Sequence, residues 1–408
     1  MSNFNRNILI VFAGTSLVNF FNLLYQSLIA HKLSAQEFSG FNSMLCIFMI
    51  ISAPLATIQI ALTKYISQFN ATNQLLKIKS LLCGLFVKLS LIAAATLLIS
   101  LLFSAPLMNI LKINSPSCGY LLASLLALAW LIPFFNGTIL GLELFNRYVY
   151  SSVASGALKL ILSFLLITLG YRITGALGAL LISSIIGLLI LYLPLKKYFI
   201  FSKGPEVINY REVFVYLLPV ALASFCFMLL VTFDMVLVKY FFSSQDSGSY
   251  SLAQMAGKIF LFLPAAISIV MFPRTSGLNA KNLDTVSTLK RSICYVGALC
   301  TAAVIIYNCF PGFILKALTG KSFVESVFLG RFFAVSMSFF ALLFILITYF
   351  LSIKDLRFIK YLAAFTLLQI LGIIFFHPTL VSVQLILCIN STLLFLIHLF
   401  LLFRRRMP

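Results

Sequence analysis

Twelve long apolar runs, separated by short polar connections, dominate this chain of 408 residues. An α-helix rises about 1.5 Å per residue and the hydrocarbon core of a bilayer is about 30 Å thick, so about 20 apolar residues can cross it. The runs lie at 8–30, 41–62, 81–103, 118–140, 149–169, 174–194, 213–240, 248–272, 292–315, 325–351, 361–378 and 380–402. The pattern predicts an all-α, polytopic membrane protein with about 12 transmembrane helices.

The distribution of charge agrees with a membrane protein. Hydrophobic residues make up 62% of the chain and charged residues 9%, which excludes a water-soluble surface. The net charge of +20 would suit nucleic acid, but the 29 basic residues lie mostly between apolar runs, so we expect no nucleic-acid binding. Placing both termini in the cytoplasm puts 19 basic residues inside and 7 outside, as the positive-inside rule requires. The first run has no small-residue cleavage site, so we expect it to be retained as a span.

Several classes of protein are disfavoured by what lies between the runs. No connection exceeds about twenty residues, and the outer side offers only Glu37, Asp246 and Glu325 as acids. A membrane enzyme acting on sugars would normally use acidic residues on a larger outer loop, so we expect no catalytic residues and no enzyme. The eight cysteines form no Cys-x-x-Cys pair and there is no histidine cluster, so neither a metal nor a cofactor is expected. A nucleotide-binding G-x-x-x-x-G-K-[ST] loop is also absent from the sequence.

Two parts of the sequence about 210 positions apart carry similar motifs. Ser34–Gly40 and Ser243–Gly248 each follow a long apolar run, and Pro54 matches Pro264 at an offset of 210. A membrane protein built as a doubled unit has a natural cavity between its halves, which is the usual design of a carrier. The repeat therefore favours transport across the bilayer.

The most linker-like segment lies near the middle of the chain. Residues 196–212 combine mixed charge with a Gly-Pro pair, which is typical of a connection between structural units. We therefore expect an N-terminal six-helix lobe at 1–195, a cytoplasmic linker at 196–212 and a C-terminal six-helix lobe at 213–408, arranged around a central cavity.

Polar side chains recur along one face of the first run. Thr15, Asn19, Asn22 and Gln26 follow helical spacing, so this face should point into the protein, because a polar group in hydrocarbon costs free energy unless it has a partner. Hydrogen bonding between helices and the lining of a wet cavity are both open interpretations. An offset of 208 places Gln26 opposite Asp234, so both halves would present polar groups at matching places.

Charged side chains inside the runs are the strongest candidates for a binding site. Lys159 and Lys258 lie near the middle of their spans, where a lysine costs roughly 2.5–3.5 kcal/mol. Lys88 lies nearer the cytoplasmic end of its span and could snorkel to the interface. Asp234 is a candidate ion-coupling residue, or a structural partner of Lys258, Arg331 or Lys239. The excess of lysine suits an anionic cargo such as a phosphate or diphosphate.

Three stretches resemble bacterial polysaccharide flippases of the Wzx type, which belong to the multidrug/oligosaccharidyl-lipid/polysaccharide exporter superfamily. These stretches are His31 to Pro54, Gly141 to Arg147, and Asp234 to Pro273. The resemblance implies two six-helix lobes and a cargo of oligosaccharide linked to polyprenyl diphosphate, flipped to the outer leaflet of the bacterial cytoplasmic (inner) membrane for cell-surface polysaccharide such as O-antigen. The diphosphate would face Lys159, Lys258 and Lys88. Membrane lipid and a glycan polymerase or other assembly proteins would be partners.

Other functions stay open at this point. A multidrug or cation antiporter of the same superfamily would share the lobes, although such carriers usually place acids in the cavity, and the first run has amides instead. A peptidoglycan-precursor flippase typically has fourteen spans, and a major-facilitator carrier has a basic signature that 63–80 lacks. A membrane scaffold for a glycan-assembly complex is the alternative outside transport.

Overall fold

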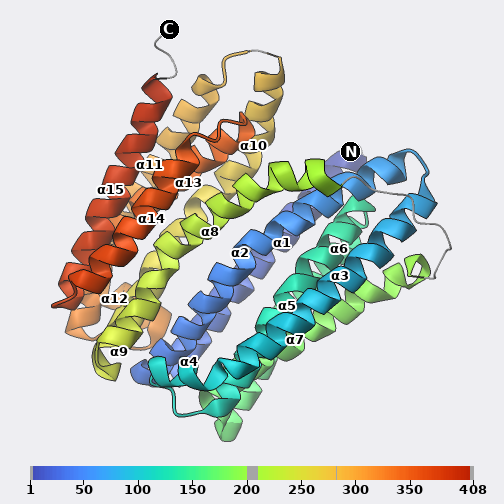
Figure 1. Cartoon of the computed structure of the whole chain (residues 1–408). Helices are drawn as coiled ribbons and strands as arrows, with labels where there is room; N and C mark the ends of the chain where they lie inside the picture. Colours follow the sequence, from blue (N-terminus) through green and yellow to red (C-terminus); the bar gives the residue numbers. More distant parts are fainter. Residues whose placement is uncertain (1–2, 200–209, 282, 405–408) are drawn as a thin grey trace. The chain divides into compact units, whose positions relative to one another are not determined.

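The computed structural model describes residues 3–199, 210–281 and 283–404, and within them every regular element is a helix (Figure 1). This confirms the prediction of an all-α protein. The α-helices are α1 (Asn3–Lys32), α2 (Ala35–Ala71), α3 (Leu75–Leu102), α4 (Ser104–Ile110), α5 (Pro116–Gly141), α6 (Phe145–Leu166), α7 (Arg172–Leu195), α8 (Tyr210–Phe241), α9 (Ser244–Lys258), α10 (Leu263–Ala280), α11 (Val286–Cys309), α12 (Pro311–Thr319), α13 (Val324–Ser352), α14 (Phe358–Phe375) and α15 (Leu380–Arg404).

The predicted spans coincide with these helices. Among the described residues, nine helical segments are long and apolar enough to cross a membrane, and one of them, Phe145–Leu195, covers two predicted spans. The predicted span 8–30 lies on α1, and 248–272 lies on α9 and α10. That second span is not one continuous α-helix, as the sequence suggested, because a 3₁₀ turn at Ile259–Phe262 interrupts it. The prediction of a polytopic membrane protein is confirmed.

A sharp bend separates α6 from α7. The helical hydrogen bonding loosens over Ile167–Tyr171, and Gly170 adopts φ +93°. This backbone conformation is strained for residues with a side chain but not for glycine, so Gly170 allows the chain to turn here. Both helices pack against each other along their length. The 51-residue apolar segment is therefore a hairpin of two helices.

The chain divides into two compact units. Unit 1 contains Met1–Leu33 and Ile51–Ala221, and unit 2 contains Ser34–Ile50 and Leu222–Pro408. Two helices, α2 and α8, therefore each contribute to both units. Most of the predicted linker, 196–212, lies outside the described residues, so the lobe boundaries expected from sequence stay a prediction.

Each unit has its own packing centre. In unit 1, α5 packs between α3 and α7, and α6 packs against both α1 and α7 (Figure 1). Aromatic rings fill part of this core, with Phe86, Phe134 and Phe135 in mutual contact. In unit 2, α13 packs against α9, α10, α11 and α15, which makes it the central helix of that unit.

The two similar sequence motifs begin helices in the same way. Before α2, the Ser34 hydroxyl accepts from the Glu37 amide while the Glu37 carboxylate accepts from the Ser34 amide. Before α9, the Ser243 hydroxyl accepts from the Asp246 amide and donates to its carboxylate at 2.7 Å. Such caps satisfy backbone groups at a helix start that have no partner within the helix. The repeat in sequence thus encodes a repeated helix start in unit 2.

Candidate functional site

Lys159 lies on α6 inside unit 1, with its ammonium group held by two neighbours on α1. Its Nζ donates a hydrogen bond to Oδ1 of Asn22 and lies 4.6 Å from the centre of the Tyr25 ring. The Tyr25 hydroxyl in turn donates to the carbonyl of Ala176 on α7 at 2.8 Å. These contacts fix a cation among three helices, and a lysine ammonium has three donors, so it can also bind a further acceptor.

A polar cavity of about 320 Å³ opens beside Lys159. Its wall comes from α1, α5, α6 and α7, and most of its polar groups are hydroxyls and amides. They belong to Asn22, Asn136, Ser151, Ser152, Ser155, Ser183 and Ser184. We call this space the serine cavity. It offers neutral hydrogen-bonding groups and one lysine, a combination that suits a hydroxylated or anionic ligand.

Spacing along α6 and α7 explains why these groups converge. Ser151, Ser155 and Lys159 follow one another at intervals of four residues, so they share one helix face. On α7, Gly187 faces them, and a Cβ at this position would lie 2.2 Å from Oγ of Ser155. The Ser151 hydroxyl donates to the Gly187 carbonyl at 2.8 Å. The glycine therefore lets α7 approach the serine face of α6 closely.

A second polar cluster is buried in unit 2, around Asp234 on α8. The carboxylate is fully buried and accepts from the Tyr250 hydroxyl at 2.7 Å and from Nε2 of Gln254 at 3.0 Å. Gln254 accepts from Nδ2 of Asn42 at 2.9 Å. Among the described side chains, hydroxyl and amide donors thus hold Asp234, while Lys258 attracts it electrostatically from farther away.

Lys258 and Lys239 have separate partners in the same unit. Nζ of Lys258 donates to Sγ of Cys46 at 3.2 Å, one turn along α2 from Asn42. Nζ of Lys239 donates to the hydroxyl of Ser39 at 2.9 Å, and Ser39 lies 3.4 Å from the hydroxyl of Ser247. We call Asp234, Tyr250, Gln254, Asn42, Cys46 and Lys258 the buried polar chain.

The remaining predicted site residues lie apart from these clusters. Asn19 is exposed on α1 and Gln26 is half-buried there, so of the predicted amide face the structure brings Asn22 alone to Lys159. Lys88 is exposed on α3, which begins at Leu75, thirteen residues earlier. It is therefore deeper in its helix than the sequence suggested. Lys88 and Lys159 belong to unit 1 and Lys258 belongs to unit 2, so a diphosphate site shared by the three lysines stays a prediction.

Several polar residues of the two clusters were missed by sequence reasoning. Tyr250 and Gln254 follow Ser243 in α9, and only the structure shows that they donate hydrogen bonds to Asp234 on α8. Lys239, near the end of α8, is also buried. The serines of α6 carry a detectable signal, because Ser151 and Ser155 lie on the Lys159 face. Within the described residues, no group of three or more His, Cys, Asp or Glu side chains could hold a metal ion.

The fold is similar to those of solved membrane transporters. An inward-facing multidrug resistance MATE family transporter of the MOP superfamily matches with a TM-score of 0.72 and 17% identity, over 96% of both chains. The inward closed conformation of the lipid II flippase MurJ matches with a TM-score of 0.72 and 16% identity, over 97% of this chain and 87% of the other. At such low identities these likenesses establish the fold alone.

The sequence then defines the family. A model of the polysaccharide biosynthesis protein family matches residues 4–279, and the chain belongs to that family. A search of curated proteins found no match. The family and the fold together confirm the resemblance to polysaccharide flippases of the MOP superfamily.

Proposed function

We propose that this protein flips an oligosaccharide linked to polyprenyl diphosphate from the cytoplasmic to the outer leaflet for cell-surface polysaccharide biosynthesis, such as that of O-antigen. Its family is that of polysaccharide biosynthesis proteins, and the solved structures that it resembles include a lipid II flippase. The single observation that carries the proposal is the serine cavity with Lys159 on its wall. A transporter rather than an enzyme is the reading that these observations support.

The chemistry of that cargo explains why a polar cavity is needed. Sugar hydroxyls and a diphosphate cost several kcal/mol per unpaired group in hydrocarbon. Serine hydroxyls and the amides of Asn22 and Asn136 can exchange hydrogen bonds with sugar hydroxyls, and Lys159 can pair with a phosphate oxygen. The polyprenyl chain can stay in an apolar environment while the head group crosses.

Other charged and polar residues of both units have further roles in the proposal. Lys258 is a further candidate for the diphosphate, and Lys88, Asn19 and Gln26 are candidates along the path of the head group. Asp234 is the candidate ion-coupling residue, because its carboxylate is fully buried in a span and its partners are neutral donors. Membrane lipid and a glycan polymerase or other assembly proteins are the proposed partners.

The rival functions predict different behaviour. A multidrug antiporter would carry small cations, which the Lys159 ammonium group repels. A scaffold of a glycan-assembly complex would carry nothing. The test is flipping of a radiolabelled lipid-linked oligosaccharide by purified protein in liposomes, with accessibility to an outside glycosidase as the readout. Flipping above protein-free liposomes supports the proposal; cation efflux without flipping supports the antiporter, and neither activity supports the scaffold.

The proposed location is the bacterial cytoplasmic (inner) membrane, with both termini and the 196–212 connection in the cytoplasm. The proposal rests on the 19 basic residues on that side against 7 on the other. Single cysteines at Ser202 and Ser244 should therefore react with an impermeant thiol reagent from opposite sides. Equal labelling of both from outside would contradict this orientation.

A further inference from the structure

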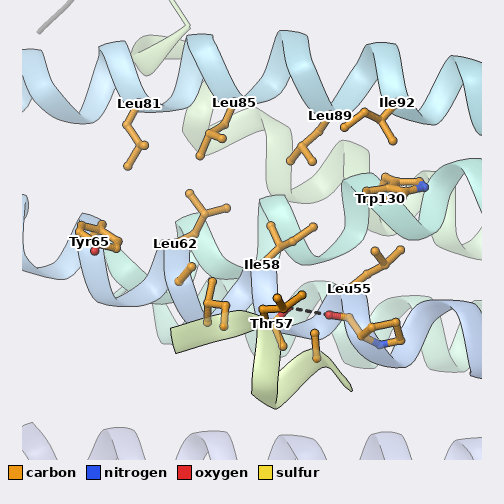
Figure 2. Close-up of a pocket in the computed structure, with 15 residues that line it drawn as sticks. Leu55, Thr57, Ile58, Leu62, Tyr65, Leu81, Leu85, Leu89, Ile92 and Trp130 are labelled. Carbon is orange, nitrogen blue, oxygen red and sulfur yellow. Dashed lines mark hydrogen bonds between the residues drawn. The ribbon is translucent and has the colours of Figure 1, made fainter. Parts of the chain in front are cut away.

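A second cavity of unit 1 has the opposite character to the serine cavity. It has a volume of about 330 Å³ and lies between α2, α3, α5 and the start of α8 (Figure 2). Branched aliphatic side chains of α3 face those of α2 across it, with one aromatic ring at each end. The labelled residues in Figure 2 are Leu55, Thr57, Ile58, Leu62, Tyr65, Leu81, Leu85, Leu89, Ile92 and Trp130. We call this space the apolar groove.

The wall of the groove has almost no groups that could form hydrogen bonds with a sugar. The Thr57 hydroxyl donates to the carbonyl of Pro54 at 2.6 Å, so its proton is already used within α2 (Figure 2). Leu81 and Leu89 line the groove from α3 and also belong to the buried hydrophobic core of the unit. A sugar hydroxyl placed here would lose its hydrogen bonds to water without replacement, whereas hydrocarbon would lose nothing. The groove therefore suits an apolar chain.

Polar groups border the groove where an anionic head group could meet them. Lys88 follows Leu85 by three residues and precedes Ile92 by four, so it shares the groove side of α3. At the other end, Nζ of Lys64 lies 5.8 Å from the centre of the Tyr65 ring. Cations at two positions beside an apolar groove complement a lipid that carries phosphate.

The indole of Trp130 adds a second, independent feature. Its Nε1 atom is buried and, within the described residues, has no hydrogen-bond partner. Trp130 lines the groove beside Leu89 and Ile92, as Figure 2 shows. A buried N–H donor without a partner costs free energy, which an acceptor on a ligand would recover. A phosphate or diphosphate oxygen passing the middle of the span is such an acceptor.

We propose that the apolar groove binds the isoprenoid chain of a polyprenyl phosphate, the anchor of the cargo in the proposed function on which this inference rests. An isoprenoid chain is methyl-branched and carries a double bond in every unit. It has fewer conformations to lose than a saturated acyl chain of equal length, so ordering it in a groove costs less. Its phosphate can pair with the cations beside the groove, and its alkenes can pack against the two aromatic rings.

The chain contains a single tryptophan, and it lines this groove, so fluorescence reports directly on the occupant. The full protein is placed in nanodiscs containing brominated phosphatidylcholine, whose bromine atoms quench Trp130 on contact. Polyprenyl monophosphate is then titrated against a saturated long-chain alkyl phosphate. We expect polyprenyl monophosphate to relieve quenching and the alkyl phosphate to leave it unchanged. Equal relief by both compounds, or no relief by either although the brominated lipid quenches Trp130, would overturn the inference.

Matched variants on α3 separate the groove from the lipid-facing surface. Leu85→Phe fills the groove, whereas Leu91→Phe changes a side chain that is 66% exposed on the same helix. A larger side chain leaves less room in the groove, so Leu85→Phe should weaken the apparent affinity for polyprenyl monophosphate about tenfold or more. Leu91→Phe should match the unmodified protein. Equal affinity in all three proteins would contradict a site in the groove.

A second measurement covers the case in which brominated lipid does not reach Trp130 or Leu85→Phe does not fold. A photoreactive polyprenyl monophosphate is crosslinked to the unmodified protein, and the labelled peptides are identified by mass spectrometry. Labels on the groove faces of α2, α3 or α5 support the inference, and labels confined to other helices overturn it. Failure of the proposed function would look different. The protein would then not flip lipid-linked oligosaccharide, while the fluorescence of Trp130 would still respond to polyprenyl monophosphate.

Discussion

Lys159 in α6 and Lys258 in α9 are equally buried, each with 9% of its surface exposed, and their surroundings differ in kind. Lys159 contacts one amide and one aromatic ring and lies on the wall of a cavity of about 320 Å³. Lys258 contacts Cys46 within the buried polar chain, where each polar group already has a partner. Equal burial therefore goes with two environments, and in the described residues Lys159 lines an open cavity whereas Lys258 contacts a buried thiol.

Replacing Lys159 should have the largest effect on transport. Lys159→Ala removes the cation of the serine cavity, and a hydrogen bond to a charged group contributes about 1.5–3 kcal/mol, so flipping should fall roughly tenfold to a hundredfold. Lys159→Arg should keep part of the activity because it keeps the charge. Flipping by purified protein at matched amounts is the measurement. Lys290→Ala, which removes an exposed cation of α11, is the control for net charge and should flip normally.

Breaking the buried polar chain should instead act on stability. Asp234→Ala leaves the Tyr250 hydroxyl and the Gln254 amide buried without their acceptor, which should cost about 3 kcal/mol. Asp234→Asn keeps one acceptor oxygen and should cost less. Asn22→Ala, at the open serine cavity, should cost least because water can replace the amide. Thermal unfolding in detergent tests this order, and a larger loss for Asn22→Ala than for Asp234→Ala would reverse the comparison.

Adding one methyl group at a glycine should show that the surroundings of Lys258 are packed more tightly than the serine cavity. A Cβ at Gly257 would lie 2.6 Å from Cβ of Phe333, which cannot move without its helix, so Gly257→Ala should cost about 1–3 kcal/mol. A Cβ at Gly187 would meet the hydroxyl of Ser155, which can rotate toward the serine cavity, so Gly187→Ala should cost less. Gly297→Ala is the control, since nothing lies within 4 Å there. Similar melting temperatures for Gly257→Ala and Gly297→Ala would contradict this expectation.

The smallest expected effect is on reaction rates with a water-soluble thiol reagent. Cys46 is fully buried in the buried polar chain, so it should react slowly when it is the only cysteine in the protein. Ser155→Cys in a background without other cysteines places a thiol on the wall of the serine cavity and should react faster. Labelling is followed by mass spectrometry over time. Faster labelling of Cys46 would show that the buried polar chain, and not the serine cavity, is open to water.

The helices of this fold could be predicted from sequence because hydrocarbon imposes a simple rule on each span. Every predicted run coincides with one helix or with consecutive helices, and the errors fall at breaks such as Ile259–Phe262, where local geometry decides. The pairing of Asn22 with Lys159 could have been predicted, because both are polar residues within apolar runs and each needs a partner there. The partners of Asp234 were not, because they depend on how α8, α9 and the start of α2 pack within unit 2.

The bend at Gly170 bears on how the protein enters the membrane. Nothing lies within 4 Å of a Cβ built at this position, so a side chain would be opposed by the positive φ alone and not by neighbours. During synthesis, an apolar stretch of 51 residues can insert either as a hairpin or as one overlong helix. The glycine favours the hairpin, which leaves Arg172 at the turn, whereas one overlong helix would place this charge within a span at a cost in free energy. Together with Arg172, whose φ is also positive at 44°, the glycine thereby divides one long apolar stretch into two helices that can cross the membrane in opposite directions.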